Sequence, residues 1–160
     1  MLHIDVICIG KIKESFFRDA IQEYAKRLSK YCILSIIELP DEKIPLNLNE
    51  KNIELIKEKE SNKILSHIKK GSYTICLDLN GKNLNSIEFA QTINSLSIER
   101  QAHITFLIGG SLGMSNELLN YADKKISFSN LTFPHQLIRV FLLEQLFRSF
   151  KIINGETYHR

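Results

Sequence analysis

The stretch "HITFLIGGSLGMSNELL", residues 103–119, decides the fold of this chain. An apolar, strand-forming run ends at Ile108, glycines follow in "GGSLG", and a helical pattern comes next. In open α/β sheets, ligands bind beyond the carboxyl ends of the strands, and glycine lets the backbone approach a ligand closely. The spacing G-G-x-x-G fits neither a dinucleotide fingerprint nor a Walker loop. Taken alone, this corner is either a tight strand-to-helix turn or part of a small-molecule site.

Short strand-forming runs alternate with helical patterns on both sides of this corner. The expected strands are residues 2–10, 32–39, 72–79, 103–108 and 125–129. The expected helices are residues 14–31, 50–70, 87–100, 115–123 and 134–152, with Ser86 as N-cap of the third and Pro134 at the first position of the last. The alternation predicts a single α/β domain over residues 1–160, with a mostly parallel sheet and helices on both faces. We expect a loop at 40–49 and an exposed, solvated helix at 50–70.

The composition is that of an ordinary soluble globular protein, with 44% hydrophobic residues, 24% charged residues and a formal net charge of +3. No apolar run approaches the roughly 20 residues that cross a membrane, and the N-terminus lacks a signal-peptide pattern, so we expect a cytoplasmic protein. Cys8, Cys32 and Cys76 each lie in an apolar segment. That placement favours buried, reduced thiols over a metal site or a disulfide.

The last expected helix is apolar around most of its circumference. Its apolar side chains exceed what one sheet face can cover, and they include Leu137, Ile138, Val140, Phe141, Leu142, Leu143, Leu146, Phe147 and Phe150. A helix of this kind is buried on two sides. In a chain this small, a second copy is the simplest cover for the second side, so the pattern predicts a two-fold homodimer packed through this helix.

Two further corners share the composition and the position of the first. They are "LDLNGK" at residues 77–82 and "SFSNLTFPH" at residues 127–135, and each lies at the end of an expected strand. Because the carboxyl ends of parallel strands meet at one edge of a sheet, the three corners together favour a small-molecule site over a simple turn.

These corners resemble the motifs of the SPOUT superfamily of methyltransferases. The matching stretches are "LDxxGK" (77–82), "LIGGSxG" (107–113), "LTFPHQLxRxxLxEQLFR" (131–148) and the terminal "YHR". Their order and spacing are similar to those of the small bacterial members that methylate N3 of a pseudouridine in 23S ribosomal RNA, and the similarity covers essentially the whole chain. The resemblance implies an α/β fold with a C-terminal trefoil knot that forms a pocket for S-adenosyl-L-methionine.

The resemblance also implies which residues bind this cofactor. They are Leu77, Gly109 and the segment Phe128, Ser129, Asn130, Leu131, Thr132 and Phe133. Apolar side chains would flank the adenine, while backbone groups would bond its edges and the ribose. Methyl transfer from a sulfonium needs no metal, and its main requirement is a nucleophilic nitrogen in line with the methyl group.

Five residues are candidates for RNA binding or proton transfer: His135, Arg139, Tyr158, His159 and Arg160. His135 either acts on the N3 proton or on RNA, or packs or caps the helix start. Arg139 either holds an RNA phosphate across a dimer interface, or is a surface arginine or a partner of Glu144. The terminal residues would fold over the site, Tyr158 stacking on a base and Arg160 holding a phosphate, whereas termini without a role commonly fray. His3, His67 and His103 are expected to be structural.

The chain departs from the family pattern at two positions, with Thr157 where a proline usually precedes the terminal Tyr-His and Phe147 where a tyrosine is common. The resemblance further implies the assembled 70S ribosome as the substrate, and the modest net charge agrees with weak binding of free RNA. Two alternatives stay open: a SPOUT relative that methylates another RNA such as tRNA, and a non-catalytic nucleotide-binding module.

Overall fold

The computed structural model describes residues 1–99 and 102–160. Its centre is a five-stranded sheet of order β2-β1-β4-β3-β5. The strands are β1 (Leu2–Ile9), β2 (Cys32–Leu39), β3 (Tyr73–Asn83), β4 (His103–Ile108) and β5 (Lys124–Ser127). Each neighbouring pair is parallel, and the Ile-rich strands are typical of a sheet buried on both faces. The predicted α/β fold with a mostly parallel sheet is confirmed.

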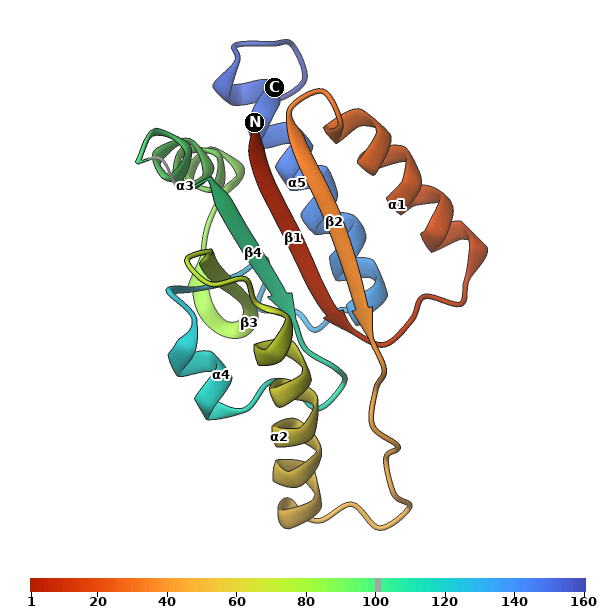
Figure 1. Cartoon of the computed structure of the whole chain (residues 1–160). Helices are drawn as coiled ribbons and strands as arrows, with labels where there is room; N and C mark the ends of the chain where they lie inside the picture. The colour runs from red at the N-terminus through yellow and green to blue at the C-terminus, as the bar shows by residue number, and fades with distance from the viewer. Residues whose placement is uncertain (100–101) are drawn as a thin grey trace.

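Helices cover both faces of the sheet, as predicted (Figure 1). One face carries the larger apolar core under α1 (Ser15–Leu28), α3 (Ser86–Ile98) and α5 (His135–Ile153). The other face carries a smaller core under α2 (Glu50–His67) and α4 (Asn116–Tyr121). Because α2 and α4 lie toward the carboxyl ends of the strands, that edge of the sheet is enclosed on both sides.

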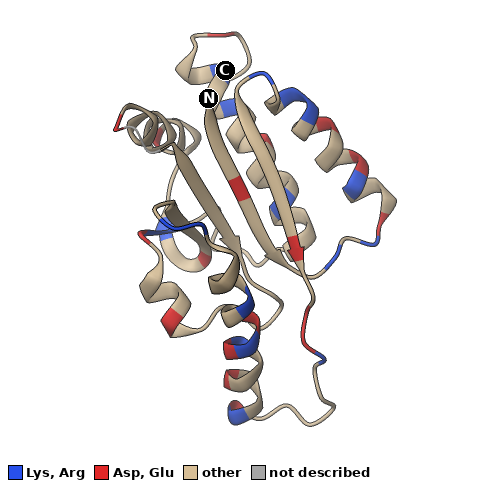
Figure 2. Cartoon of the chain, in the orientation of Figure 1, with Lys and Arg blue, Asp and Glu red and all other residues tan. Residues whose placement is uncertain are grey.

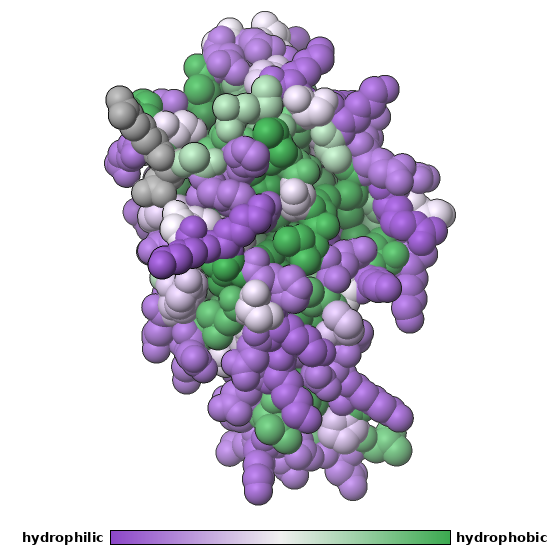
Figure 3. Space-filling view, in the orientation of Figure 1, coloured by the Kyte–Doolittle hydropathy of each residue, from purple (hydrophilic) through white to green (hydrophobic). Residues whose placement is uncertain are grey.

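The amino-terminal half of the second face is not covered by a helix. Apolar side chains reach the surface there (Figure 3), and Ile33 of β2 is 46% exposed. On the same face, the buried carboxylate of Asp5 lies 2.8 Å from His103 and 3.2 Å from Lys69. The contact with Asp5 gives His103 the structural role that the sequence predicts.

Strand β3 meets β5 at two separated points. Ile126 of β5 pairs with Leu77 and, past an irregularity in β3, also with Lys82. At Gly81, just before Lys82, an added Cβ would lie 2.6 Å from the backbone of Ile126. The prediction of a strand that ends at residue 79 and turns at "NGK" is wrong, because these residues continue β3 past Ile126.

Helix α5 is the middle helix of its layer, between α1 and α3 (Figure 1). Its buried apolar side chains are Leu142, Leu143, Leu146, Phe147 and Phe150. Helices α1 and α3 of the same chain thus cover part of the apolar surface of α5. The sequence pattern assigns that part to a second copy of the chain. The remaining face carries a half-buried stripe, which comprises Leu137, Val140, Phe141, Glu144 and Arg148.

Two helix starts differ from the prediction by one residue. Asn85, and not Ser86, caps α3: its side chain accepts the backbone N–H of Glu88, whose carboxylate accepts the N–H of Asn85 in return. Ser86 is the first helical residue, and its hydroxyl donates to Gln145 of α5. Pro134 is the N-cap of α5 and not its first helical residue.

Other element ends differ by a few residues, as is usual at frayed termini. Helices α1, α2 and α4 are shorter than the predicted ranges, and β5 lies at 124–127 rather than 125–129. The predicted end of α3 at Arg100 lies outside the described residues.

Helix α2 is not the fully exposed helix that its charge pattern predicts. Lysines and glutamates lie along its outer side (Figure 2), yet Ile56, Glu60, Ser61 and Ile64 are buried. The loop at 40–49 leads into this helix from β2, and its side chains Ile44, Leu46 and Leu48 are exposed. The loop at 40–49, with its apolar side chains, and helix α2, with the buried Glu60, therefore lie beside the carboxyl edge of the sheet.

The cysteines lie where the sequence predicts, in the core. Cys8, Cys32 and Cys76 are buried and unpaired, and burial raises the pKa of each thiol to about 12. They stay protonated and inert at neutral pH. Over residues 1–99 and 102–160, no three His, Cys, Asp or Glu side chains are grouped to hold a metal ion, and none of the helices there is long and apolar enough to cross a membrane.

Candidate functional site

The three glycine-containing or polar corners meet at the carboxyl edge of the sheet. Leu77 of β3 pairs with Ile108 of β4 on one side and with Ile126 of β5 on the other. Gly109 directly follows the first of these partners, and Phe128 lies two residues beyond the second. The segments 77–82, 107–113 and 127–135 therefore leave the sheet at one level, where open α/β sheets bind ligands.

The segment 128–133 offers backbone groups to a ligand. It has no regular secondary structure, and no backbone–backbone hydrogen bond of its residues is found within the described chain. Side chains hold its shape instead. Ser127 donates to the carbonyl oxygen of Ser129 at 2.8 Å, and Asn83 donates to the side chain of Asn130 at 2.9 Å.

Apolar side chains stand at both ends of this segment. Phe128 packs edge-on against Phe89 of α3, with 5.8 Å between the ring centroids. Phe133 packs edge-on against Phe141 of α5 at 5.4 Å, while Leu131 between them is 68% exposed. Two backbone groups of the segment, the Ser129 carbonyl and the Leu131 N–H, bond to serine side chains. A flat apolar ring with polar edges fits the combination of apolar walls and the remaining backbone groups.

The glycines at 109 and 110 are required by space. An added Cβ at Gly109 would lie 2.8 Å from Met114 Cγ, and one at Gly110 would lie 2.7 Å from Glu60 Oε1. Gly113 differs, because space around it is open and its φ of +89° calls for glycine. The segment 107–113 therefore forms a tight turn, and its backbone packs closely against Glu60 of α2.

Arg139 joins the start of α5 to the ends of β1 and β2. Its side chain is 2% exposed, donates to the carbonyl oxygens of Ile9 and Gly10 at 2.8 Å each, and pairs with Glu38 at 2.8 Å. Arg139 is thus neither a surface arginine nor a partner of Glu144, and both of those predictions are wrong. Holding an RNA phosphate would require it to leave these contacts, so the single chain uses Arg139 as a positioning residue.

Arg139 also determines the charge and the tautomer of the His135 imidazole. Nη2 of Arg139 lies 3.3 Å from Nδ1 of His135, and burial together with the Arg139 charge lowers the pKa of His135. The imidazole is therefore neutral at neutral pH. The two protons of this Nη2 already serve the carbonyl oxygens of Ile9 and Gly10. A proton on Nδ1 would face a cation that has no acceptor, so the ring proton resides on Nε2. His135 presents an N–H donor to its surroundings.

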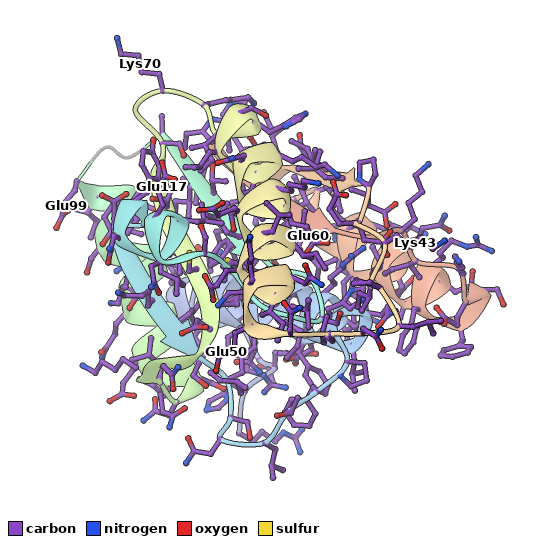
Figure 4. All side chains as sticks on the ribbon, turned by 90° about the horizontal axis from the view of Figure 1, so that it is seen from below. Lys43, Glu50, Glu60, Lys70, Glu99 and Glu117 are labelled. Carbon is purple, nitrogen blue, oxygen red and sulfur yellow. The ribbon has the colours of Figure 1, made fainter. Side chains whose placement is uncertain are left out.

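Those surroundings are a cavity between β1, the loop at 40–49, α2 and the start of α5. Its wall includes Ile9, Asp41, Glu60, Gly110, Ser111 and His135. Figure 4 shows Glu60 on the side of α2 that faces the loop carrying Lys43. Burial raises the pKa of Glu60.

Sequence reasoning missed Glu60, because it lies in a run of lysines and glutamates. A signal was present nonetheless. Glu60 stands four residues from both Ile56 and Ile64, on one helical stripe, and all three are buried. A carboxylate between two apolar residues at helical spacing is a candidate for burial.

The chain's last residues pack on the far end of α5. Tyr158 lies edge-on to Phe147, with ring centroids 5.0 Å apart, and its hydroxyl donates to Glu144 at 3.2 Å. Glu144 also pairs with Arg148 at 2.6 Å, so the cationic partner of Glu144 is Arg148 and not Arg139. Phe147 is buried at the position where the family commonly has tyrosine.

The structure therefore divides the five candidate residues into two groups. His135 and Arg139 lie together at the carboxyl edge of the sheet. Tyr158, His159 and Arg160 lie at the opposite edge, where the two chain termini are close together (Figure 1). Within one chain, the terminal residues do not reach the cavity beside His135.

Comparison with known proteins gives the family. The model of a family described as predicted SPOUT methyltransferase matches residues 2–159. The chain belongs to the SPOUT methyltransferase family. A protein of Clostridium novyi (strain NT) named ribosomal RNA large subunit methyltransferase H is 54% identical over 159 residues, which are 99% of this chain and 100% of the relative. The protein of the same name from Clostridioides difficile (strain 630) is 51% identical over the same shares.

Solved structures agree on the fold of this SPOUT methyltransferase. The A. aeolicus TrmH/SpoU tRNA modifying enzyme is 18% identical, with a TM-score of 0.51 over 95% of this chain and 77% of that one. A probable methylase family protein from Haemophilus influenzae Rd KW20 is 13% identical, with a TM-score of 0.52 over 98% of this chain and 70% of that one. At such identities the likeness is one of fold alone.

Proposed function

We propose that this SPOUT methyltransferase uses S-adenosyl-L-methionine to methylate N3 of a pseudouridine in 23S ribosomal RNA, within the assembled 70S ribosome of the cytoplasm. The observation that carries the proposal is the pairing of Leu77 with both Ile108 and Ile126, because it gathers the three family corners around one site. The names of the full-length relatives support an rRNA substrate.

The second contact between β3 and β5 supports a trefoil knot. Ile126 pairs with Leu77 before the irregularity in β3 and with Lys82 after it, so residues 78–81 depart from the regular strand beside Ile126. The close approach of Gly81 to the backbone of Ile126 leaves no room for a side chain at this point of β3. Such a close approach is what a later segment threaded through an earlier loop requires, although threaded chains are rare.

The residues at the carboxyl edge fit the cofactor. Leu77 and Phe128 offer apolar surface to the adenine, and the backbone of 128–133 offers donors and acceptors to its edges and to the ribose. When bound, S-adenosyl-L-methionine supplies a methyl group activated by its sulfonium. The protein's part is to hold the target nitrogen in line with that methyl group.

His135 acts in this scheme as a donor and not as a base. Its Nε2–H can donate to a carbonyl oxygen beside N3 of the target base. That hydrogen bond would stabilise the negative charge that develops on the ring as N3 loses its proton to solvent and accepts the methyl group, with S-adenosylhomocysteine as the leaving group. Arg139 positions the imidazole through the 3.3 Å contact to Nδ1.

A homodimer packed through α5 would reunite the two groups of candidate residues. If the two copies of α5 run antiparallel about a two-fold axis, the tail of one copy comes to the His135 end of the other. The half-buried stripe on the outer face of α5 would be covered in that interface, Leu137, Val140 and Phe141 included. Tyr158, His159 and Arg160 would then meet RNA at the partner's site.

The modest charge explains why the ribosome is the proposed substrate. With a formal net charge of +3, the chain releases few counterions on RNA and binds free RNA weakly. A shaped cleft of the assembled ribosome would supply the recognition that the domain lacks.

Methyl transfer from radiolabelled S-adenosyl-L-methionine tests the proposal. The acceptors are 70S ribosomes, separated subunits, free 23S rRNA and bulk tRNA, all from cells that lack the enzyme. We expect label in 23S rRNA of whole ribosomes only, and N3-methylpseudouridine after digestion to nucleosides. Label in tRNA would overturn the substrate, and cofactor binding without any transfer would favour a non-catalytic binding module.

A further inference from the structure

Glu60 is a buried residue whose two carboxylate oxygens differ: one accepts a hydrogen bond, and the other lies next to Gly110. Its side chain is 4% exposed. Oε2 accepts the backbone N–H of Glu42 at 3.0 Å, whereas Oε1 accepts no hydrogen bond in the part of the chain that the structure describes. Oε1 lies where a Cβ of Gly110 would come within 2.7 Å of it. Oε1 therefore has no protein donor among the described residues and keeps some solvent contact in the cavity, so a ligand that carries a hydrogen-bond donor or a positive charge can reach it.

The cavity that Glu60 lines adjoins the cofactor segments on two sides. Gly110 in its wall follows Gly109, and His135 in its wall follows the segment 128–133 by two residues. A ligand that extends from the adenine site past Gly109 therefore comes to the cavity wall that Gly110 and Glu60 share.

The charges of this cavity select a cation. Glu60, Asp41 and Glu42 bring carboxylates to its wall, against the neutral imidazole of His135. The carboxylate of Glu42 has its own partner in Lys63 at 2.8 Å, but Glu60 has no cationic partner in the described chain. An RNA phosphate would be repelled here. The methionine half of the cofactor carries two positive groups, the sulfonium and the α-ammonium, and one negative group, the α-carboxylate. In this cavity the positive groups would face the carboxylates, and the α-carboxylate would point away from them.

We propose that Glu60 binds a cationic group of the methionine half of S-adenosyl-L-methionine, so that the cavity beside Gly110 is the cofactor's charged subsite. The inference rests on the proposed function, since it concerns the same cofactor. It adds a residue of α2 to a site otherwise built from the three corners. The loop at 40–49 belongs to the subsite as well, because the Glu42 N–H holds the carboxylate in place.

The proposal links cofactor affinity to pH. A bound cation favours the ionised carboxylate, so binding releases a proton wherever free Glu60 is protonated, and affinity rises as the pH rises through the pKa of the free group. The groups that face Glu60 are Asp41 and Glu42 of the loop, Lys63 of α2 and His135 of α5. A comparison with Glu60→Gln separates its contribution from theirs.

Calorimetry of the full chain with three ligands tests the proposal. S-adenosyl-L-methionine has both cationic groups, S-adenosylhomocysteine has only the ammonium, and 5′-methylthioadenosine has neither. Glu60→Gln keeps the shape and an oxygen for the Glu42 N–H. We expect it to weaken the two charged ligands by about tenfold to a hundredfold and to leave 5′-methylthioadenosine unchanged. Glu58→Gln, at an exposed position of the same helix and outside the cavity wall, is the control and should change each affinity by no more than about twofold.

Each outcome decides the matter. An equal loss for both charged ligands assigns Glu60 to the ammonium, and a larger loss for S-adenosyl-L-methionine assigns it to the sulfonium. Equal losses for all three ligands, or unchanged binding with reduced turnover, would overturn the subsite. If wild-type protein binds none of them, the proposed function itself fails. Should Glu60→Gln not fold, wild-type affinity between about pH 5 and about pH 7 decides, since only the charged ligands should bind more tightly at the higher pH.

Discussion

His135 and His159 lie at opposite ends of helix α5. His135 is the first residue of the helix, while Nδ1 of His159 lies 3.2 Å from Arg148 near its end. At 1.5 Å of rise per residue, His135 and Arg148 are about 20 Å apart along the helix axis. Both histidines belong to the set that the family resemblance marks as functional, and no side chain spans that distance. A site that uses both requires two chains.

Substitutions in the C-terminal tail, residues 158–160, should lower methyl transfer to RNA without changing the affinity for S-adenosyl-L-methionine. We expect the double variant His159→Ala/Arg160→Ala to lower kcat/KM on 70S ribosomes by at least about tenfold, because it removes contacts to RNA, and to leave cofactor affinity within about twofold. Tyr158→Phe is the matched control. It removes only the hydroxyl bonded to Glu144 at 3.2 Å and keeps the ring on Phe147. Loss of cofactor binding in the double variant would argue against a tail that serves RNA.

Arg139 should be a large contributor to stability. Arg139→Met removes the donor to the carbonyl oxygens of Ile9 and Gly10. It also removes the cationic partner of Glu38, whose carboxylate keeps only the N–H of Ile12 among the described residues. We expect the free energy of unfolding in urea to fall by about 2–4 kcal/mol. Arg18→Met, on the exposed side of α1, is the control and should unfold like the wild type. Equal losses in the two variants would mean that the buried contacts of Arg139 carry no special weight.

The fold and the meeting of the corners follow from local patterns. Strand-forming runs such as "HITFLI" end at glycine, and helical spacing resumes after each corner. Parallel strands joined by helices place those corners at one edge, so the local patterns are enough to predict that Leu77 and Gly109 lie close together. The apolar excess of α5 is also evident in the sequence, although α1 and α3 cover part of it.

The remaining features depend on contacts between distant residues. "NGK" has the composition of a turn, yet it continues β3, in which Leu77 and Lys82 both pair with Ile126 of β5. The carbonyl that Arg139 binds at Gly10 is 129 residues away in sequence. Glu60 lies in a sequence segment rich in charged residues, and the exposed charges of α2 make its buried side difficult to recognise from the sequence. No local pattern encodes such pairings.

The close approach of Gly81 to the backbone of Ile126 should make position 81 intolerant of any side chain. Gly81→Ala would place a Cβ within 2.6 Å of the Ile126 backbone, and we expect a loss of several kcal/mol, roughly that of a disrupted core, together with loss of cofactor binding. Gly71→Ala is the control, because its φ of +83° strains the backbone while space around it is open. It should cost only about 1–2 kcal/mol. A milder effect at Gly81 than at Gly71 would contradict this close approach.

His135 should make the protein less stable in mild acid. Burial and the Arg139 charge lower its pKa in the folded chain below the ordinary value of 6.5. The unfolded chain then binds the proton first. The contribution of neutral His135 to the free energy of unfolding is complete above the pKa that His135 has in the unfolded chain. This contribution is lost as the pH falls toward the lower pKa that His135 has in the folded chain. The urea midpoint of the wild type should fall more between about pH 7 and about pH 5 than that of His135→Gln. Parallel curves would show that His135 titrates normally.

Subunit complementation on 70S ribosomes tests the composite site most directly. His135→Ala and His159→Ala/Arg160→Ala should each be inactive alone, because every site in either homodimer lacks one group. After the two proteins are unfolded and refolded together in equal amounts, mixed dimers contain one site with both groups intact. Random pairing then predicts about a quarter of wild-type methyl transfer. If the mixture stays as inactive as its components, His135 and the tail do not act across two chains, and the account of a composite site is wrong.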